Sequence, residues 1–145
     1  MTGSQRSPAQ TFSFLIGAVL TVAGIVGFFY NGDFSAGSHI PSDDVFGLLS
    51  VNGWHNVVHL LTGLVGLKAA RTWTGARAYS YAVFVLYTAI FVLGLAYGTH
   101  DAVLSLIPIN AADDALHGII AAAALVSGLA TPDVRPPTLA PSASP

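Results

Sequence analysis

The chain carries a run of polar side chains inside an apolar stretch, VNGWHNVVHLLTG, at residues 51–63. The polar members of this run are Asn52, His55, Asn56 and His59. Residues four apart lie on the same face of a helix, so His55 and His59 would present two imidazoles side by side. Imidazole nitrogens are ligands of zinc and other divalent transition metals. The same run also fits the start of a capped helix, because Asn is a common N-cap residue.

A second polar run follows 58 positions later, in INAADDALHG at residues 109–118. Its polar members are Asn110, Asp113, Asp114 and His117. At this shift Asn110 matches Asn52, and His117 matches His59. We therefore expect two copies of one unit, which consists of a plain apolar helix, an outer loop and a helix with a polar start. The two copies would have the same orientation and be related by an axis along the membrane normal.

If the two polar runs face each other, they would supply three imidazoles and a carboxylate to a divalent metal ion such as zinc. These candidate ligands are His55, His59, Asp113 and His117. A haem held between His59 and His117 is the alternative cofactor. The other polar residues would orient the rings or cap the helices: Asn52, Asn56, Asn110 and Asp114. A network of caps and interhelical hydrogen bonds explains the same residues without any ligand.

The composition places these runs in a membrane protein. Of the 145 residues, 53% are hydrophobic and 8% are charged, whereas soluble domains usually have about 25% charged residues. Four stretches approach the roughly 20 residues that a helix needs to cross a bilayer. They cover about residues 11–30, 52–70, 78–98 and 111–130. The chain has no Cys, which excludes thiolate ligands and disulfides, and its net charge of −2 gives no reason to expect a nucleic-acid partner.

The distribution of basic residues predicts the orientation of these spans. All five Lys and Arg residues fall on one face of the membrane: Arg6, Lys68, Arg71, Arg77 and Arg135. The positive-inside rule makes this face cytoplasmic, so both termini are predicted to be cytoplasmic. Residues 1–10 and 131–145 are expected to be a disordered head and tail. We predict an all-α, integral four-helix bundle over residues 11–130, with small helices or turns in the outer loops at 43–51 and 101–109.

The stretches NGWHNVVHLLTGLVGLKAAR and LIPINAADDALHGIIAAAAL resemble those of a bacterial family of small four-helix membrane proteins, which is catalogued only as a domain of unknown function. The family patterns are similar to Asn-x-x-His-Asn-x-x-His-x-x-x-Gly in the second helix and Asn-x-Ala-Asp-Asn-x-x-His in the fourth. Asp114 stands where the family tends to have Asn. The resemblance covers about residues 11–130 and implies a topology without an activity.

The sequence carries no nucleophile–base pair, phosphate loop or metalloprotease motif. No catalytic residue is therefore assigned, and a non-enzymatic role is favoured over an enzymatic one. The leading expectation is a structural or accessory protein of the bacterial cytoplasmic membrane. Its partners would be the lipid bilayer, with other membrane subunits or copies of itself. The alternatives are a metal-binding or haem-binding membrane protein and, third, a transporter of small solutes.

Overall fold

The computed structural model describes residues 6–37, 40–97 and 102–134. Arg135 and most of the predicted head and tail lie outside these residues. The described chain is mostly helical, as predicted, and its elements are α1 (Pro8–Tyr30), β1 (Asp43–Val45), β2 (Leu49–Val51), α2 (Gly53–Ala69), α3 (Trp73–Tyr97) and α4 (Ala111–Leu129). Three of the helices, α1, α3 and α4, are long and apolar enough to cross a membrane. With 17 residues, α2 is at the short end of the range for a span, about 17–25 residues.

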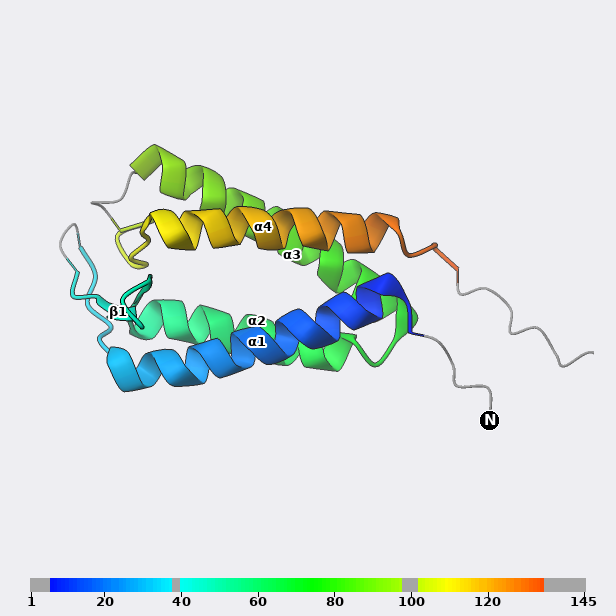
Figure 1. The fold of residues 1–145 in the computed structure, drawn as a ribbon, viewed down its shortest axis with the longest axis horizontal. Helices are drawn as coiled ribbons and strands as arrows, with labels where there is room; N and C mark the ends of the chain where they lie inside the picture. The colour runs from blue at the N-terminus through cyan, green and yellow to red at the C-terminus, as the bar shows by residue number, and fades with distance from the viewer. Residues whose placement is uncertain (1–5, 38–39, 98–101, 135–145) are drawn as a thin grey trace, which may run out of the picture.

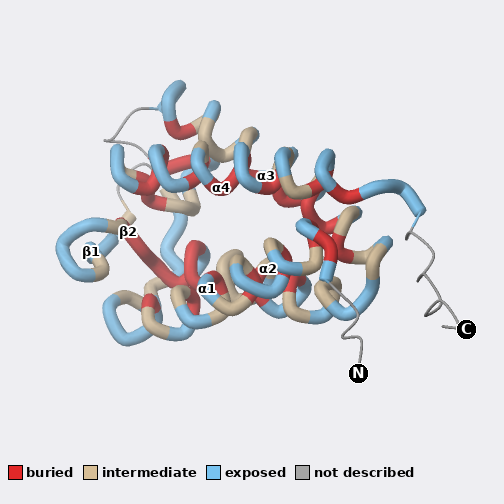
Figure 2. Tube along the Cα trace, turned by 45° about the vertical axis from the view of Figure 1, so that its right-hand side comes forward, coloured by how far each residue is buried: buried red, intermediate tan, exposed pale blue. Residues whose placement is uncertain are grey.

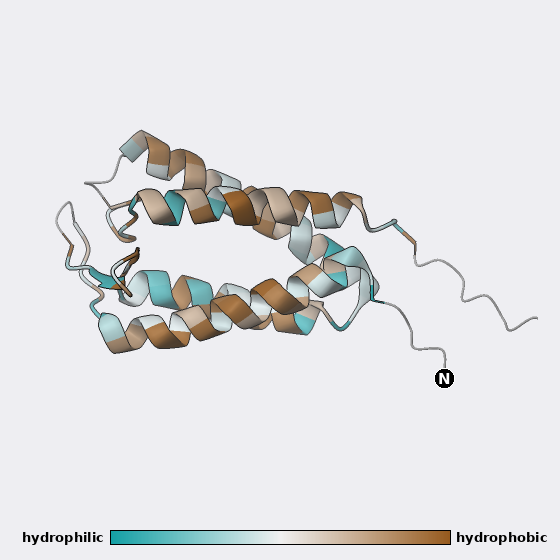
Figure 3. Cartoon of the chain, viewed as in Figure 1, coloured by the Kyte–Doolittle hydropathy of each residue, from teal (hydrophilic) through white to brown (hydrophobic). Residues whose placement is uncertain are grey.

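The helices pack as two pairs, with α1 along α2 and α3 along α4 (Figure 1). The strands lie at one end of the molecule, and both ends of the described chain lie at the other. Exposed residues follow the outer sides of the helices, and buried residues follow the sides that face each other (Figure 2). Hydrophobic residues dominate the middle of the helices (Figure 3). This is the distribution expected where lipid rather than water surrounds the helices.

Helices α1 and α2 are held together by glycines at their contact. A Cβ atom added to Gly63 would lie 2.8 Å from the carbonyl oxygen of Gly17, and one added to Gly17 would lie 2.8 Å from the amide nitrogen of Leu67. Only hydrogen atoms fit at these positions, so the two backbones come closer than larger residues would permit. Small residues serve this purpose in membrane helices, where close packing replaces the hydrophobic effect.

Helix α1 begins three residues before the predicted span because its first turn is capped. The Ser7 hydroxyl accepts from the Gln10 amide, and the Gln10 side chain accepts in return from the Ser7 amide. Pro8 occupies the first helical position, where its missing N–H costs nothing. Ser7 is buried, and the Thr131 hydroxyl accepts from the Ala9 amide at 2.9 Å. Ser7 and Ala9 in the predicted head and Thr131 in the predicted tail therefore belong to the folded part of the chain.

The outer loops are predicted as small helices or turns, and the structure has tight turns closed by short antiparallel pairing. Strands β1 and β2 form an antiparallel hairpin in which Asp43 pairs with Val51. The turn of the hairpin has left-handed φ angles at Phe46 (54°) and Gly47 (70°). In the second loop Val103 pairs with Ile107 across a turn of the same kind. The five residues around each tight turn satisfy some of their backbone groups by pairing across it, which a helix of this length would not achieve.

Candidate functional site

The two polar runs start the helices α2 and α4 in the same way. The Asn52 side-chain oxygen accepts from the His55 amide at 2.9 Å. The Asn110 side-chain oxygen accepts from the amides of Ala112 and Asp113, at 2.9 and 3.0 Å. These bonds use amides that have no partner within the helix. Asn52 and Asn110 are thus the N-caps of the two helices.

The same two asparagines also join the outer loops crosswise. The Asn52 amide group donates to the carbonyl of Leu106 at 2.7 Å, and the Asn110 amide group donates to the carbonyl of Leu48 at 2.8 Å. Leu48 and Leu106 occupy matching positions in the two loops, 58 residues apart. Each capped helix therefore holds the loop that precedes the other one.

Asn56 and Asp114 occupy a second pair of matching positions. A Cβ atom on Gly27 of α1 would collide with the Oδ1 atom of Asn56, and one on Gly94 of α3 would collide with the Oδ1 atom of Asp114. Asn56 donates to the carbonyl of Asn31 at 2.7 Å. In the described part of the chain neither Asn56 nor Asp114 hydrogen-bonds to an imidazole ring. Both side chains fill the space that a glycine leaves on the neighbouring helix.

Three of the four candidate metal ligands come together. One nitrogen from each of His55, His59 and His117 lies within 4.8 Å of the other two. His55 and His117 are buried, and His59 is partly buried. The Nε2 atoms of His55 and His59 are 3.1 Å apart. Two nitrogens bound to one tetrahedral zinc ion at about 2.0–2.1 Å would be roughly 3.3–3.4 Å apart. The two Nε2 atoms would therefore have to move only slightly to bind a zinc ion together.

The orientation of His55 is fixed by the hairpin. Its Nδ1 atom lies 2.8 Å from the carbonyl oxygen of Ser50 in β2. A carbonyl oxygen only accepts, so Nδ1 carries the proton, and the lone pair of a neutral ring is left on Nε2. This Nε2 faces His59. Metal-bound histidines are usually held in this manner, with the other ring nitrogen donating to a carbonyl or carboxylate.

A small cavity lies among the three imidazoles. It has a volume of about 10 Å³ and is lined by His55, Val58, His59, Tyr87, Ile90, Ile107 and His117. The ring of Tyr87 in α3 packs edge-on against that of His117, with 5.3 Å between their centroids. The Tyr87 hydroxyl and the Nδ1 atom of His117 are both buried without a hydrogen-bond partner among the residues that the structure describes. A space of this size holds about one water molecule or ion.

Asp113, the fourth candidate ligand, is used differently. Its Oδ2 atom accepts from the amide of Asn110 and from the amide of Ser50, both at 3.0 Å. It therefore completes the capping of α4 and fastens β2 to that helix. Ser50 links the two parts of the site, because its amide binds Asp113 and its carbonyl binds His55. Neither Ser50 nor Tyr87 was among the residues predicted from the sequence.

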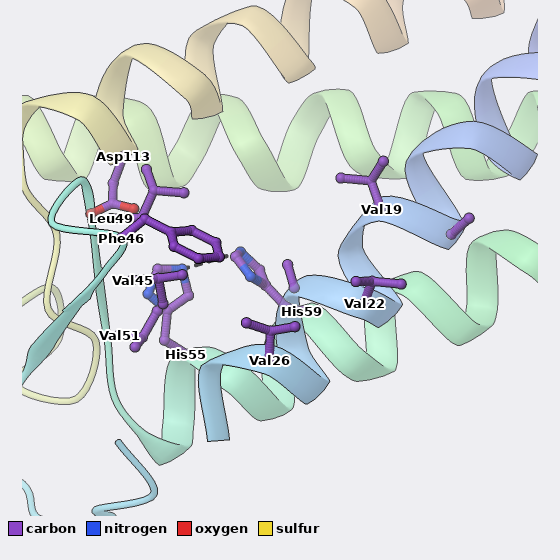
Figure 4. A pocket seen from close by; sticks show the side chains of 12 residues that line it. Val19, Val22, Val26, Val45, Phe46, Leu49, Val51, His55, His59 and Asp113 are labelled. Carbon is purple, nitrogen blue, oxygen red and sulfur yellow. Dashed lines mark hydrogen bonds between the residues drawn. The ribbon is translucent and has the colours of Figure 1, made fainter. Parts of the chain in front are cut away.

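A larger pocket lies beside the histidines (Figure 4). Its volume is about 460 Å³, and its walls come from α1, the hairpin, α2 and α4. The lining residues are Ala18, Val19, Val22, Ala23, Val26, Val45, Phe46, Leu49, Val51, His55, His59 and Asp113. All but the last three are apolar, so the pocket is an apolar chamber with a few polar groups at one end.

These features define a helical protein with membrane-length helices and a buried histidine cluster at one end. A family model matches residues 10–130, and the chain belongs to that family, the domain of unknown function DUF4383. No curated protein and no solved structure matches the chain.

Proposed function

We propose that this chain is a multi-pass protein of the bacterial cytoplasmic membrane that binds one divalent transition-metal ion, of the zinc type, through His55, His59 and His117. The observation that carries the proposal is the convergence of three imidazole nitrogens within 4.8 Å of one another. Ionisable side chains within membrane spans are costly and mark functional sites by default. Three histidines from two helices, gathered around one small cavity, are therefore better explained by a shared ligand than by packing.

The chemistry of the three rings supports a metal ion as this ligand. The imidazole of His55 keeps a lone pair on Nε2 because the Ser50 carbonyl holds its other nitrogen, and this Nε2 lies 3.1 Å from the Nε2 atom of His59. Nitrogen ligands of this type suit zinc, copper and nickel ions. Zinc sites with three protein ligands keep a fourth position for water or substrate. The Tyr87 hydroxyl, which is buried without a hydrogen-bond partner among the described residues, is a group that such a water molecule could reach.

The size of the site disfavours the haem alternative. A cavity of about 10 Å³ between the imidazoles has no room for a macrocycle. Transport is also disfavoured, because a buried apolar core lies farther along the helices, toward the other end of the molecule. That core includes Leu20, Val83 and Ala124. A solute leaving the site in that direction would have to open this packing.

An accessory role, the leading expectation from the sequence, is compatible with a metal site. His55 and His59 belong to α2, whereas His117 belongs to α4. A metal ion bound by all three would tie the first pair of helices to the second pair. The matched caps, loops and glycine contacts of the two pairs support a duplicated architecture in which the two copies have the same orientation.

The test is a metal-binding measurement on protein purified in detergent. We expect elemental analysis to find about one zinc ion per chain, and replacement by Co²⁺ to give a visible absorption band typical of tetrahedral coordination. His59→Ala and His117→Ala should each weaken binding at least about 100-fold, since losing a group that merely orients a ligand already costs about 10–100-fold. Asp113→Asn is the matched control, and it should keep the metal because its carboxylate is engaged by backbone amides.

A wild-type protein that takes up no stoichiometric zinc, cobalt, nickel or copper ion would overturn the proposal. Loss of the metal from Asp113→Asn, with the fold and the three histidines intact, would instead restore the carboxylate as a ligand. Circular dichroism of each variant separates loss of a ligand from loss of the fold.

A further inference from the structure

The 460 Å³ pocket beside the histidines has the size of a ligand-binding site. Pockets for small molecules usually measure about 300–1,000 Å³ and combine apolar walls with a few polar groups. Here the polar side chains in the wall are His55, His59 and Asp113, and every other lining residue is apolar. A ligand that matches this pocket has one polar end and an otherwise apolar body.

The pocket has a direction relative to the membrane. Its polar side chains lie toward the hairpin end of the helices, and its wall continues along α1 through Val26, Val22 and Val19 (Figure 4). Val26 and Val19 are seven positions apart, which corresponds to about 10 Å of helix. Val19 lies near the middle of α1, which runs from Pro8 to Tyr30. The polar end is therefore closer to the membrane surface, and the apolar end reaches toward the bilayer centre.

The pocket opens toward lipid rather than toward water. Val19 and Val22 in its wall have exposed fractions of 60% and 59%, and both belong to a membrane-length helix. Phe46 lies at the hairpin turn with an exposed fraction of 78%, and its ring points toward the histidines (Figure 4). An amphiphile in the bilayer would therefore enter sideways, with its headgroup and tail already at the depths that the pocket offers.

Two of the histidines belong to the walls of both this pocket and the small cavity. His55 and His59 line both spaces, so a metal ion held by the three imidazoles would lie at the polar end of the pocket. A fourth ligand approaching from the pocket would reach the ion beside His55 and His59, and a carboxylate oxygen is an ordinary zinc ligand at about 2.0–2.2 Å.

We propose that the pocket binds a single-chain lipid with a carboxylate headgroup, whose tail lies along Val26, Val22 and Val19 and whose carboxylate is the fourth ligand of the metal. This inference rests on the proposed metal site. A single chain is specified because the pocket follows one side of α1. A carboxylate is specified because an anionic oxygen donor complements the charge of a metal ion held by three neutral imidazoles in an apolar setting.

The test uses a fluorescent polyene fatty acid as the probe, added to the protein in nanodiscs of zwitterionic lipid. We expect saturable binding to the zinc-loaded protein, and binding at least about tenfold weaker after the metal is removed, since a contact to a charged group contributes about 1.5–3 kcal/mol. The methyl ester of the same fatty acid should bind no better to the loaded protein than to the metal-free one.

Two variants fill the pocket, and a third is their control. Ala23→Phe and Val22→Trp place bulk against the pocket wall and should abolish probe binding. Ala123→Phe adds the same bulk to an exposed position of α4 outside the pocket and should bind the probe as the wild type does. All three should keep their zinc, because none of them replaces a histidine.

The outcomes separate this inference from the proposed function. Absence of stoichiometric metal in the wild type would remove both. If the wild type binds zinc but its loaded and metal-free forms bind the probe equally well, the contact between carboxylate and metal is overturned and the metal site remains. If Ala23→Phe and Val22→Trp both hold zinc and still bind the probe as strongly as the wild type does, the probe does not bind in this pocket.

Discussion

At the scale of single residues, Asn52 and Asn110 each stabilise two parts of the fold. Each caps a helix with its oxygen and holds the opposite loop with its amide group. Asn52 is fully buried, and its bonds to the His55 amide and the Leu106 carbonyl are buried and partly buried, respectively. Removing either bond leaves a buried backbone group without a partner, which costs about 1–3 kcal/mol.

We predict that Asn52→Ala lowers the free energy of unfolding by about 2–3 kcal/mol, through the lost cap and the unpaired Leu106 carbonyl. Asn52→Ser should lose about half as much, because Ser keeps the cap and does not reach Leu106. Thr72→Ala is the control: the Thr72 hydroxyl accepts only from the nearby exposed Gly75 amide, and its loss should cost about 1 kcal/mol or less. Unfolding in mixed detergent micelles, followed by circular dichroism, measures all three. Equal stability of Asn52→Ser and the wild type would show that the Leu106 contact contributes nothing.

The sequence predicts much of the site at this scale, and the reasons for the rest are physical. The four-residue spacing brings His55 to His59, and the 58-residue match brings His117 to them. The same spacing suggests Asp113 as a neighbour of His117. Asp113 is also the third residue of α4, however, and there its carboxylate accepts from free backbone amides. Ser50 contacts Asp113 and His55 through its backbone, so the identity of its side chain gives no signal for these two contacts.

At the scale of elements, the contact between α1 and α2 depends on glycines more than on large apolar residues. A Cβ atom on Gly63 would lie 2.5 Å from the amide nitrogen of Thr21 and 2.8 Å from the carbonyl oxygen of Gly17. These are backbone atoms, which cannot turn aside as the end of a side chain can. The helices would have to separate to make room for a methyl group.

We therefore predict that Gly63→Ala destabilises the protein by about 1–3 kcal/mol, the usual cost of overpacking, despite the better helix propensity of Ala. Gly118→Ala is the matched control. Its Cβ atom would meet only the Phe91 ring, at 3.4 Å, so the gain in propensity of up to about 1 kcal/mol should leave the protein as stable as the wild type or more so. Thermal unfolding in one detergent compares the two directly. Equal stabilities would contradict the close α1–α2 contact.

Helix positions follow from the apolar pattern of the sequence, whereas the hairpin does not. Apolar stretches long enough to span a membrane can only form helices or closed barrels, which makes the helices predictable. Strands β1 and β2 have three residues each, too few for their alternation to be recognised. Their turn also places Phe46, a residue with a Cβ atom, at a left-handed φ of 54°, which local propensity disfavours. Contacts made by the folded protein hold it there.

At the scale of the whole molecule, charge separates the two ends. The described basic residues, Arg6, Lys68, Arg71 and Arg77, lie just before α1 or near the connection between α2 and α3. Arg77 forms an ion pair with Asp133 at this end. The hairpin lies at the other end (Figure 1), and the histidines belong to the first two turns of α2 and α4, which begin there. The positive-inside rule therefore predicts that the histidine site faces the outside of the cell and takes its metal from there.

The absence of cysteine from the sequence permits a direct test of this orientation, because any introduced thiol is the only one in the chain. We predict that Ser42→Cys, exposed beside β1, reacts with a membrane-impermeant maleimide in intact spheroplasts. Thr74→Cys, exposed in the first turn of α3, should react only after the membrane is permeabilised. Both must react equally in detergent, which controls for local accessibility. The reverse pattern in spheroplasts would place the histidine site at the cytoplasmic surface. A metal ion would then come from the cytoplasm, and a lipid ligand from the inner leaflet.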